Sequence, residues 1–208
     1  MEQVLDVYND AYNAAYPVVC MDESPKRLIK ETRVPIKMKP GSERKEDYEY
    51  ERSGVVNIFM ASEPLAGKRL VKVTQQKTKT DWAKFIKEIA DAQYSEAIKI
   101  RLVMDNYATH KPFALYETFE PEEAKRIWDR FEFVYTPKHG SWLNMAEIEL
   151  HVLMGQCLNR RIDDIEVMKQ EAEAWQNHRN NKKSTIDWQF KNEDARIKLK
   201  KLYPSIKA

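Results

Sequence analysis

The chain has 208 residues, of which 42% are apolar and 33% are charged, and its net charge is +2. This composition is typical of a soluble globular protein with one sizeable domain. Cys20 and Cys157 are too few for a disulfide framework, and their apolar surroundings favour free thiols in a cytosolic protein. There is no CxxC motif or His pair at zinc-ligand spacing. The longest apolar runs, such as 55–60, are strand-sized, so we expect no signal peptide or membrane span.

The basic residues are concentrated in two segments. Residues 26–45 contain eight Lys or Arg against two Glu, and residues 179–208 contain nine Lys or Arg against three acids. The rest of the chain is therefore net acidic. An acidic body with two basic segments suits a protein that holds metal ions and a polyanion together, although charge alone fits a solvated loop and tail better.

Apolar periodicity predicts the elements of the first half of the chain. The segment 24–47 is polar and contains several prolines, so we expect it to be irregular. The predicted elements are a short helix within 1–16, a strand at 17–22 that ends in Asp22, a hairpin of strands at 54–61 and 69–75, and a helix at 80–94.

The second half alternates strands with helices. The predicted elements are a strand at 97–105 that ends in Asp105, helical structure at 112–130 with a second start at Pro121, a strand at 131–136, and helices near 143–157 and 163–177. Three strands followed by alternating helices and strands fit an α/β fold, a mixed five-stranded sheet flanked by helices. This is the ribonuclease H-like layout, although element order alone does not single it out. We expect a domain at 1–178 and a basic C-terminal extension at 179–208.

Two carboxylates, Asp22 and Asp105, lie at the ends of predicted strands. A lone Asp there is usually a turn former. If the two strands are neighbours, however, the carboxylates come together, and at about 4 Å they repel by about 4 kcal/mol at an effective dielectric of about 20. A divalent cation turns this repulsion into attraction. Oxygen ligands without a Cys or His cluster favour Mg²⁺ or Mn²⁺ over zinc.

A third carboxylate, Glu147, lies at the border of an apolar helical face. The residues of that face are Leu143, Ala146, Leu150, Met154 and Cys157. Glu149 falls outside the face and is interpreted as an ordinary surface charge. Asn144, three residues before Glu147, resembles a cap, which would place Glu147 in the first turn, where the helix dipole favours an ionised carboxylate. A metal ligand, a salt bridge to a buried Arg or Lys, or an oligomer interface all fit Glu147.

Polar residues surround these carboxylates. Asn106 and His110 follow Asp105, and Lys138 and His139 precede the helix that carries Glu147. Each His could contact a phosphate or a leaving group, and ordinary hydrogen bonds within loops fit equally well. Similarly, Trp142 could pack against DNA, although packing in the core is commoner for Trp.

At these residues the sequence resembles the DDE transposases, and in particular the insertion sequence 630 family, prokaryotic relatives of mariner elements. The catalytic blocks are matched by CMDES at 20–24, LVMDNYATH at 102–110 and YTPKHGSWLNMAEIEL at 135–150. The likeness continues through ETRVP at 31–35, DYEYER at 47–52, EPLAG at 63–67, CLNRRI at 157–162, IDWQF at 186–190 and DARIKLKKLYP at 194–204. It covers nearly the whole chain in the expected order.

The resemblance implies that Asp22, Asp105 and Glu147 are the catalytic, metal-binding triad of a ribonuclease H-like nucleotidyltransferase. Two Mg²⁺ or Mn²⁺ ions would support cleavage of DNA and joining of the ends to a target with a TA sequence, with Asp22 bridging both ions. The candidate DNA contacts are Asn106, His110, Lys138, His139, Arg160, Arg161, Lys182 and Lys183.

The resemblance also implies partners and leaves alternatives open. A homodimer or larger assembly on paired DNA ends is expected, in the cytoplasm and nucleoid of a prokaryote. Such transposases usually carry a helix-turn-helix region before the first Asp; here Asp22 comes almost at once, so a separate helix-turn-helix polypeptide is a candidate partner. The interval from Asp105 to Glu147 is long for the wider group, and the helix predicted at Pro121 would account for it. A hydrolytic ribonuclease H-like nuclease and an inactive DNA-binding relic remain the alternatives.

Overall fold

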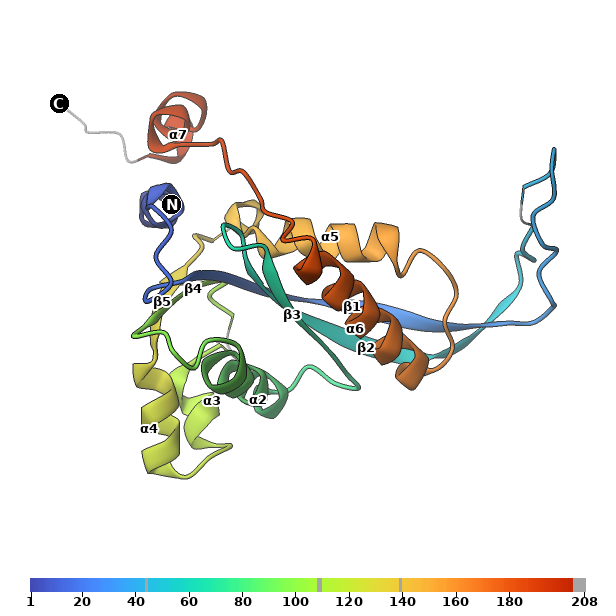
Figure 1. The fold of residues 1–208 in the computed structure, drawn as a ribbon, viewed down its shortest axis with the longest axis horizontal. Helices are drawn as coiled ribbons and strands as arrows, with labels where there is room; N and C mark the ends of the chain where they lie inside the picture. Colours follow the sequence, from blue (N-terminus) through green and yellow to red (C-terminus); the bar gives the residue numbers. More distant parts are fainter. Residues whose placement is uncertain (44, 108–109, 139, 204–208) are drawn as a thin grey trace.

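The computed structural model describes residues 1–43, 45–107, 110–138 and 140–203. Figure 1 shows one β-sheet with helices on both faces. Its strands are β1 (Val18–Glu31), β2 (Tyr50–Glu63), β3 (Lys68–Thr74), β4 (Ile100–Met104) and β5 (Phe131–Tyr135). The α-helices are α1 (Glu2–Asn9), α2 (Lys79–Glu88), α3 (Pro112–Tyr116), α4 (Pro121–Asp129), α5 (Ala146–Gln156), α6 (Ile165–Asn181) and α7 (Asn192–Lys198). A π-helix (Ile89–Gln93) continues α2, and 3₁₀ turns occupy Ser141–Leu143 and Lys200–Leu202.

The sheet is mixed, with the strand order β3-β2-β1-β4-β5. The first three strands form an antiparallel meander, whereas β4 pairs in parallel with both β1 and β5. Parallel pairing needs crossover connections, and these are supplied by α2 and by α3 with α4. The predicted mixed five-stranded α/β fold is therefore confirmed.

The prediction of an irregular segment from residue 24 onward is wrong over its first part. β1 continues to Glu31 and stays paired with β2, so the two strands form a long hairpin that extends beyond the rest of the sheet (Figure 1). Pro25 is tolerated because β4 pairs with β1 only as far as Cys20, so beyond that point β1 has only β2 beside it. Leu28 is the one buried side chain between Ser24 and Glu31. The mostly polar residues around it show no alternation of apolar and polar positions, and this removed the sequence signal for a strand.

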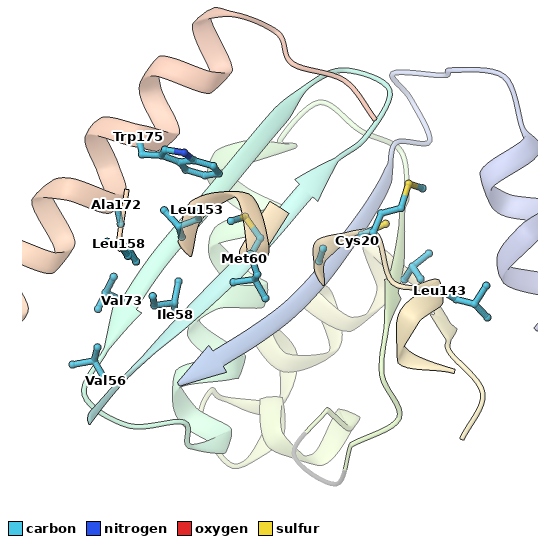
Figure 2. Packing of buried hydrophobic residues seen from close by; sticks show 14 of the residues in the cluster. Cys20, Val56, Ile58, Met60, Val73, Leu143, Leu153, Leu158, Ala172 and Trp175 are labelled. Atoms are coloured by element: carbon cyan, nitrogen blue, oxygen red, sulfur yellow. The ribbon is translucent and has the colours of Figure 1, made fainter. Parts of the chain in front are cut away.

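Side chains of alternating strand residues enter two separate hydrophobic clusters. Val19 and Met21 of β1 pack on the side of α2, α3 and α4, whereas Cys20 packs on the side of α5 and α6. Figure 2 shows the second side, where Leu153 and Trp175 from the two helices lie over the sheet. Each large apolar side chain buried in this way stabilises the fold by about 1.5–3 kcal/mol. The two clusters hold β1 and β4 from both faces and so fix the end of the sheet where the acidic residues lie.

Two helices begin at strong capping residues. Thr78 and Asp81 form a capping box at the start of α2, and the Asp164 side chain accepts hydrogen bonds from two backbone N–H groups of α6. α6 continues to Asn181, so the boundary expected at residue 178 falls inside a helix. Beyond it, Trp188 packs against the α5 and α6 cluster.

Within the residues that the structure describes, no helix is both long and apolar enough to cross a membrane.

Candidate acidic site at the end of the sheet

Asp22 lies inside β1, not at its end as predicted. β1 and β4 pair in parallel from Val18 with Arg101 to Cys20 with Val103. Continuing this register by two residues places Asp22 opposite Asp105, the first residue after β4. Asp22 comes two residues after Cys20, and Asp105 two residues after Val103; both of these residues pack in the cluster on the α5 side of the sheet. Because side chains alternate between the faces of a strand, both carboxylates are on that same side. The expectation that the two strands are neighbours is therefore confirmed.

The first turn of α5 brings Glu147 to the same edge. Asn144 is buried and fixes this turn: its Nδ2 donates to the carbonyl of Met21 at 2.8 Å, and its Oδ1 accepts from the Ala146 N–H at 3.2 Å. Asn144 is not the N-cap, which is Met145, but Glu147 does lie in the first turn. The backbone of Met21, next to Asp22, is thus tied directly to the helix that carries Glu147, which is itself partly exposed.

The electrostatics of Asp22 indicate that the three carboxylates lie within reach of one another. Burial, together with the negative charges of Glu23, Asp105 and Glu147, raises the pKa of Asp22 to about 7 against one favourable hydrogen bond. That hydrogen bond is donated by the Glu23 N–H to Oδ1 at 2.8 Å. The edge therefore carries like charges that repel one another and lack internal compensation around Asp22.

These residues fit a divalent ion in donor type and in charge. Three carboxylates supply only oxygen ligands, and a cation would relieve their mutual repulsion. Among the described residues, however, no three His, Cys, Asp or Glu side chains are already close enough to hold an ion. Asp22, Asp105 and Glu147 would therefore need small side-chain movements to share one.

A buried ion-pair network lies behind Asp105. His110 is 1% exposed; its Nδ1 lies 2.6 Å from Oδ1 of Asp105 and its Nε2 lies 3.4 Å from Oε2 of Glu23. Lys77 contacts Glu23 at 2.5 Å, and the His110 ring stacks on Trp82. Burial alone would lower the pKa of His110, but the two carboxylates outweigh it and raise the pKa to about 9. The charged imidazole in turn keeps the pKa of Asp105 below its usual range, against the effect of burial.

The ring is enclosed and both nitrogens face carboxylates, so the contact of His110 with DNA stays a prediction that this arrangement does not support. Glu23 and Lys77 were not identified from the sequence. A signal for Glu23 existed: it follows Asp22 in a strand and therefore points to the opposite face, which the apolar cluster of α2 covers. Lys77, in the loop before α2, had no such signal.

A cavity of about 580 Å³ opens beside Asp105. Asn106, Tyr107 and Lys138 line it together with Thr136, which follows β5. Asn106 and Lys138 are exposed, so both remain candidate DNA contacts. His139, the other predicted contact in this loop, lies outside the described residues.

The predicted arginine and lysine contacts divide into two groups. Arg161 is mostly buried: it pairs with Glu31 at 2.6 Å and donates to the carbonyl of Asp47 at 2.7 Å, so it ties the end of β1 to the segment just before β2. Its contact with DNA stays a prediction. The other three are exposed, namely Arg160, which pairs with Glu171, and Lys182 and Lys183 after α6.

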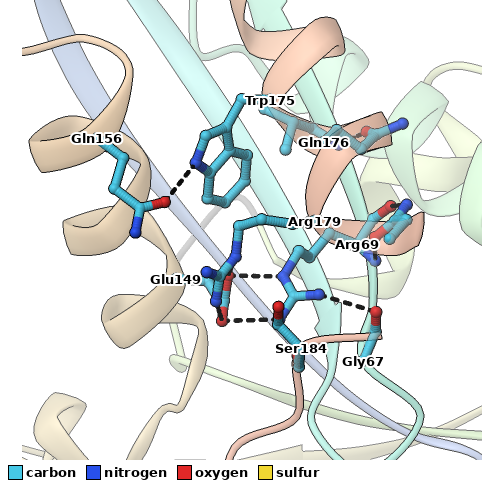
Figure 3. Close-up of polar contacts among 10 residues, drawn as sticks. Gly67, Arg69, Glu149, Gln156, Trp175, Gln176, Arg179 and Ser184 are labelled. Atoms are coloured by element: carbon cyan, nitrogen blue, oxygen red, sulfur yellow. Dashed lines mark hydrogen bonds and ion pairs between the residues drawn. The ribbon is translucent and has the colours of Figure 1, made fainter. Parts of the chain in front are cut away.

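The interpretation of Glu149 as an ordinary surface charge is wrong. Its carboxylate is 0% exposed and accepts hydrogen bonds from Arg69, at 2.6 and 2.9 Å, and from Arg179, at 2.9 and 3.2 Å (Figure 3). Arg69 also donates to the carbonyls of Gly67 and Ser184. Burial alone would raise the pKa of Glu149, but the two guanidinium groups outweigh it and hold the pKa below its usual range.

The mixed sheet with helices on both faces defines a ribonuclease H-like α/β domain. A family model described as "DDE superfamily endonuclease" matches residues 17–169, and the chain therefore belongs to this family. The matched range contains Asp22, Asp105 and Glu147.

Two solved structures illustrate the likeness in fold. The Mos1 mariner paired end complex with Mn is 14% identical, with a TM-score of 0.57, and the match covers 88% of this chain and 56% of that chain. The Mos1 strand transfer complex is 13% identical, with a TM-score of 0.56, covering 91% of this chain and 62% of that chain. This chain thus spans about three fifths of the length of the proteins it matches. No curated protein matches it.

Proposed function

We propose that the chain is the catalytic domain of a DNA transposase of the insertion sequence 630 family. Asp22, Asp105 and Glu147 would hold two Mg²⁺ or Mn²⁺ ions that support cleavage of DNA at the ends of an element and joining of those ends to a target. The observation that carries the proposal is the like-charge coupling at the sheet edge, where burial and the charges of Asp105 and Glu147 contribute to raising the pKa of Asp22 to about 7. The family match over residues 17–169 supports it.

The ions would activate the nucleophile, which is water or a 3′-hydroxyl of the DNA, and would stabilise the leaving oxygen. The residues of the chain orient the reactants. The Asn144 side chain ties the start of α5 to β1 and so keeps Glu147 beside Asp22. The cavity lined by Asn106 and Lys138 gives a phosphate access to Asp105.

The partners are part of the proposal. The similar Mos1 structures are a paired-end complex with the left transposon end and a strand transfer complex. This likeness supports DNA as a partner of this chain and a homodimer or larger assembly. A separate helix-turn-helix polypeptide would recognise the element's terminal repeats. The exposed Arg160, Lys182 and Lys183 would contact the DNA backbone without reading sequence. Such a protein would act in the cytoplasm of a prokaryote, on the nucleoid.

The test is an assay with Mg²⁺ or Mn²⁺ on both intact and pre-cleaved terminal-repeat DNA. We expect cleaved ends and joined products, and expect D105N to yield neither. Cutting without joining would identify a hydrolytic ribonuclease H-like nuclease instead. Binding without cutting would identify an inactive relic, and D105N with unchanged metal-dependent products would show that the carboxylate assignment is wrong.

A further inference from the structure

Glu23 is a buried carboxylate that the proposed chemistry does not use. Its side chain is 2% exposed, and it lies next to Asp22 in β1, on the opposite face of the strand. Burying an ionised carboxylate costs several kcal/mol, roughly, unless other groups compensate it. Two groups face it: Nζ of Lys77 at 2.5 Å and Nε2 of His110 at 3.4 Å. The chain therefore stabilises a charge at a position where an apolar residue would pack at lower cost.

His110 joins this buried charge to Asp105. Its Nδ1 lies 2.6 Å from Oδ1 of Asp105, while Nε2 faces Glu23. The ring stacks on Trp82 with the centroids 5.6 Å apart and the planes at 23°. The ring is therefore ion-paired at both nitrogens and stacked on an indole, and Nδ1 also lies 3.4 Å from the backbone carbonyl of Asp105. These contacts place the imidazole against one carboxylate oxygen of Asp105.

We propose that Glu23 and His110 are positioning residues, which hold one carboxylate oxygen of Asp105 and so leave its other oxygen for a divalent ion. The inference rests on the proposed function, because it concerns the same carboxylate. Carboxylates that bind metal ions are commonly oriented by such outer partners, and loss of one partner typically weakens metal binding by about 10–100-fold.

The charges around Asp105 decide how the two variants are interpreted. Glu23 offsets only one of the two positive charges that His110 and Lys77 bring to this side of Asp105. H110Q removes a positive charge, which by itself would tighten binding of a metal ion, so weaker binding by H110Q reports the loss of orientation. E23Q should also weaken binding, because it releases the imidazole and leaves Lys77 and His110 without their shared counter-charge.

The test is a titration of the metal-free chain with Mn²⁺, without DNA, in which free Mn²⁺ is measured by electron paramagnetic resonance. We expect H110Q and E23Q to raise the Kd for Mn²⁺ about tenfold or more, and E23D, which keeps the charge, to recover part of the loss. The matched control is E63Q. Glu63 is equally buried but lies beside the β2–β3 turn, so its substitution should leave the Kd unchanged.

Folded E23Q that binds Mn²⁺ as tightly as the wild type, or more tightly, would overturn the inference. An equal loss in E63Q would also overturn it, because the effect would then come from general loosening of the core. Circular dichroism identifies any variant that does not fold; if H110Q fails, E23Q and E23D carry the test. D105N separates this inference from the proposed function: if D105N binds Mn²⁺ as the wild type does, the site assignment itself fails.

Discussion

Glu147 and Glu149 are two residues apart in the first turn of α5, yet they lie in opposite environments. Glu149 is fully buried, and its charge is neutralised by Arg69 and Arg179. Glu147 is partly exposed and acts on Asp22 as one more negative charge. One carboxylate has its counter-charges within the fold, whereas the other adds to an excess of negative charge.

The difference teaches that burial of a carboxylate does not by itself mark a functional site. A buried acid with two guanidinium partners is fully explained by the structure it holds together, here β3 and α6 joined through α5 (Figure 3). A half-buried acid such as Asp22, whose pKa is raised by burial and by neighbouring acids, needs a counter-charge from outside the chain. The direction of the pKa shift, lowered for Glu149 and raised for Asp22, separates the two cases.

The largest expected effect is on DNA cleavage. E147Q should lower the rate of metal-dependent cleavage by roughly 10³-fold or more, since several kcal/mol of transition-state stabilisation depend on the ions. E149Q, assayed at a temperature where it is folded, should cleave within a few-fold of the wild type. A gel-based cleavage assay measures both rates, and the comparison fails if the two variants lose activity equally.

The next effect is on stability. E149Q should lower the free energy of unfolding by about 3–5 kcal/mol, because it leaves the buried guanidinium of Arg69, 1% exposed, without its counter-charge. Urea unfolding followed by circular dichroism measures the loss. A double variant with R69M should lose less than the sum of the two single changes. Strict additivity would show that the pair is not coupled.

At the acidic edge, replacing a carboxylate by an amide should raise the stability instead of lowering it. The pKa of Asp22 in the fold is about 7, above its usual value of 3.8. Its protonated form therefore contributes stability that is fully present below about pH 4 and is lost as the pH rises through 7. In metal-free buffer at pH 8, D22N should have a free energy of unfolding about 1–3 kcal/mol higher than that of the wild type, and should therefore unfold at a higher urea concentration. At pH 4 the two proteins should differ little. A loss of stability for D22N at pH 8 would contradict this account of the site.

The smallest effect should appear at the C-terminal end of α6. K182A should weaken DNA binding by about two- to fivefold, because Lys182 is exposed and free to contact a phosphate. It should also reduce the salt slope, which is the slope of the logarithm of the binding constant against the logarithm of the salt concentration, by about 1. R179A, three residues earlier, should mainly lower stability, since Arg179 is paired with Glu149. Fluorescence anisotropy across a range of salt concentrations measures the affinity for DNA and its salt dependence. Equal salt slopes for K182A and the wild type would remove Lys182 from the interface.

The order of the elements predicted the mixed sheet, but it left open whether the strands that carry Asp22 and Asp105 are neighbours, which the parallel pairing of β1 with β4 now shows. The prediction from sequence failed for Glu149. The helical wheel assigned Ala146 and Leu150 correctly, but the buried surface of α5 also includes Glu149 and Leu153. Arg69 of β3 and Arg179 of α6 cover Glu149, and neither contact can be read from the periodicity of one helix.

Two other features depend on contacts between distant segments and carry no local signal. Arg69 meets Glu149 across 80 residues of sequence, and His110 is enclosed by Trp82 from another helix. An arginine in a strand of alternating polarity and a histidine in a polar loop both resemble surface residues. Only the tertiary packing shows that their charges are used inside the protein.

The central claim is that Asp22, Asp105 and Glu147 share divalent ions, whereas Glu149 belongs to the fold. The most direct test is a titration of the wild type, E147Q and E149Q with Mn²⁺ at a temperature where all three are folded. We predict that E147Q binds Mn²⁺ at least about tenfold more weakly than the wild type and that E149Q binds like the wild type. If E147Q binds like the wild type, Glu147 does not hold the ion and the proposed site is wrong.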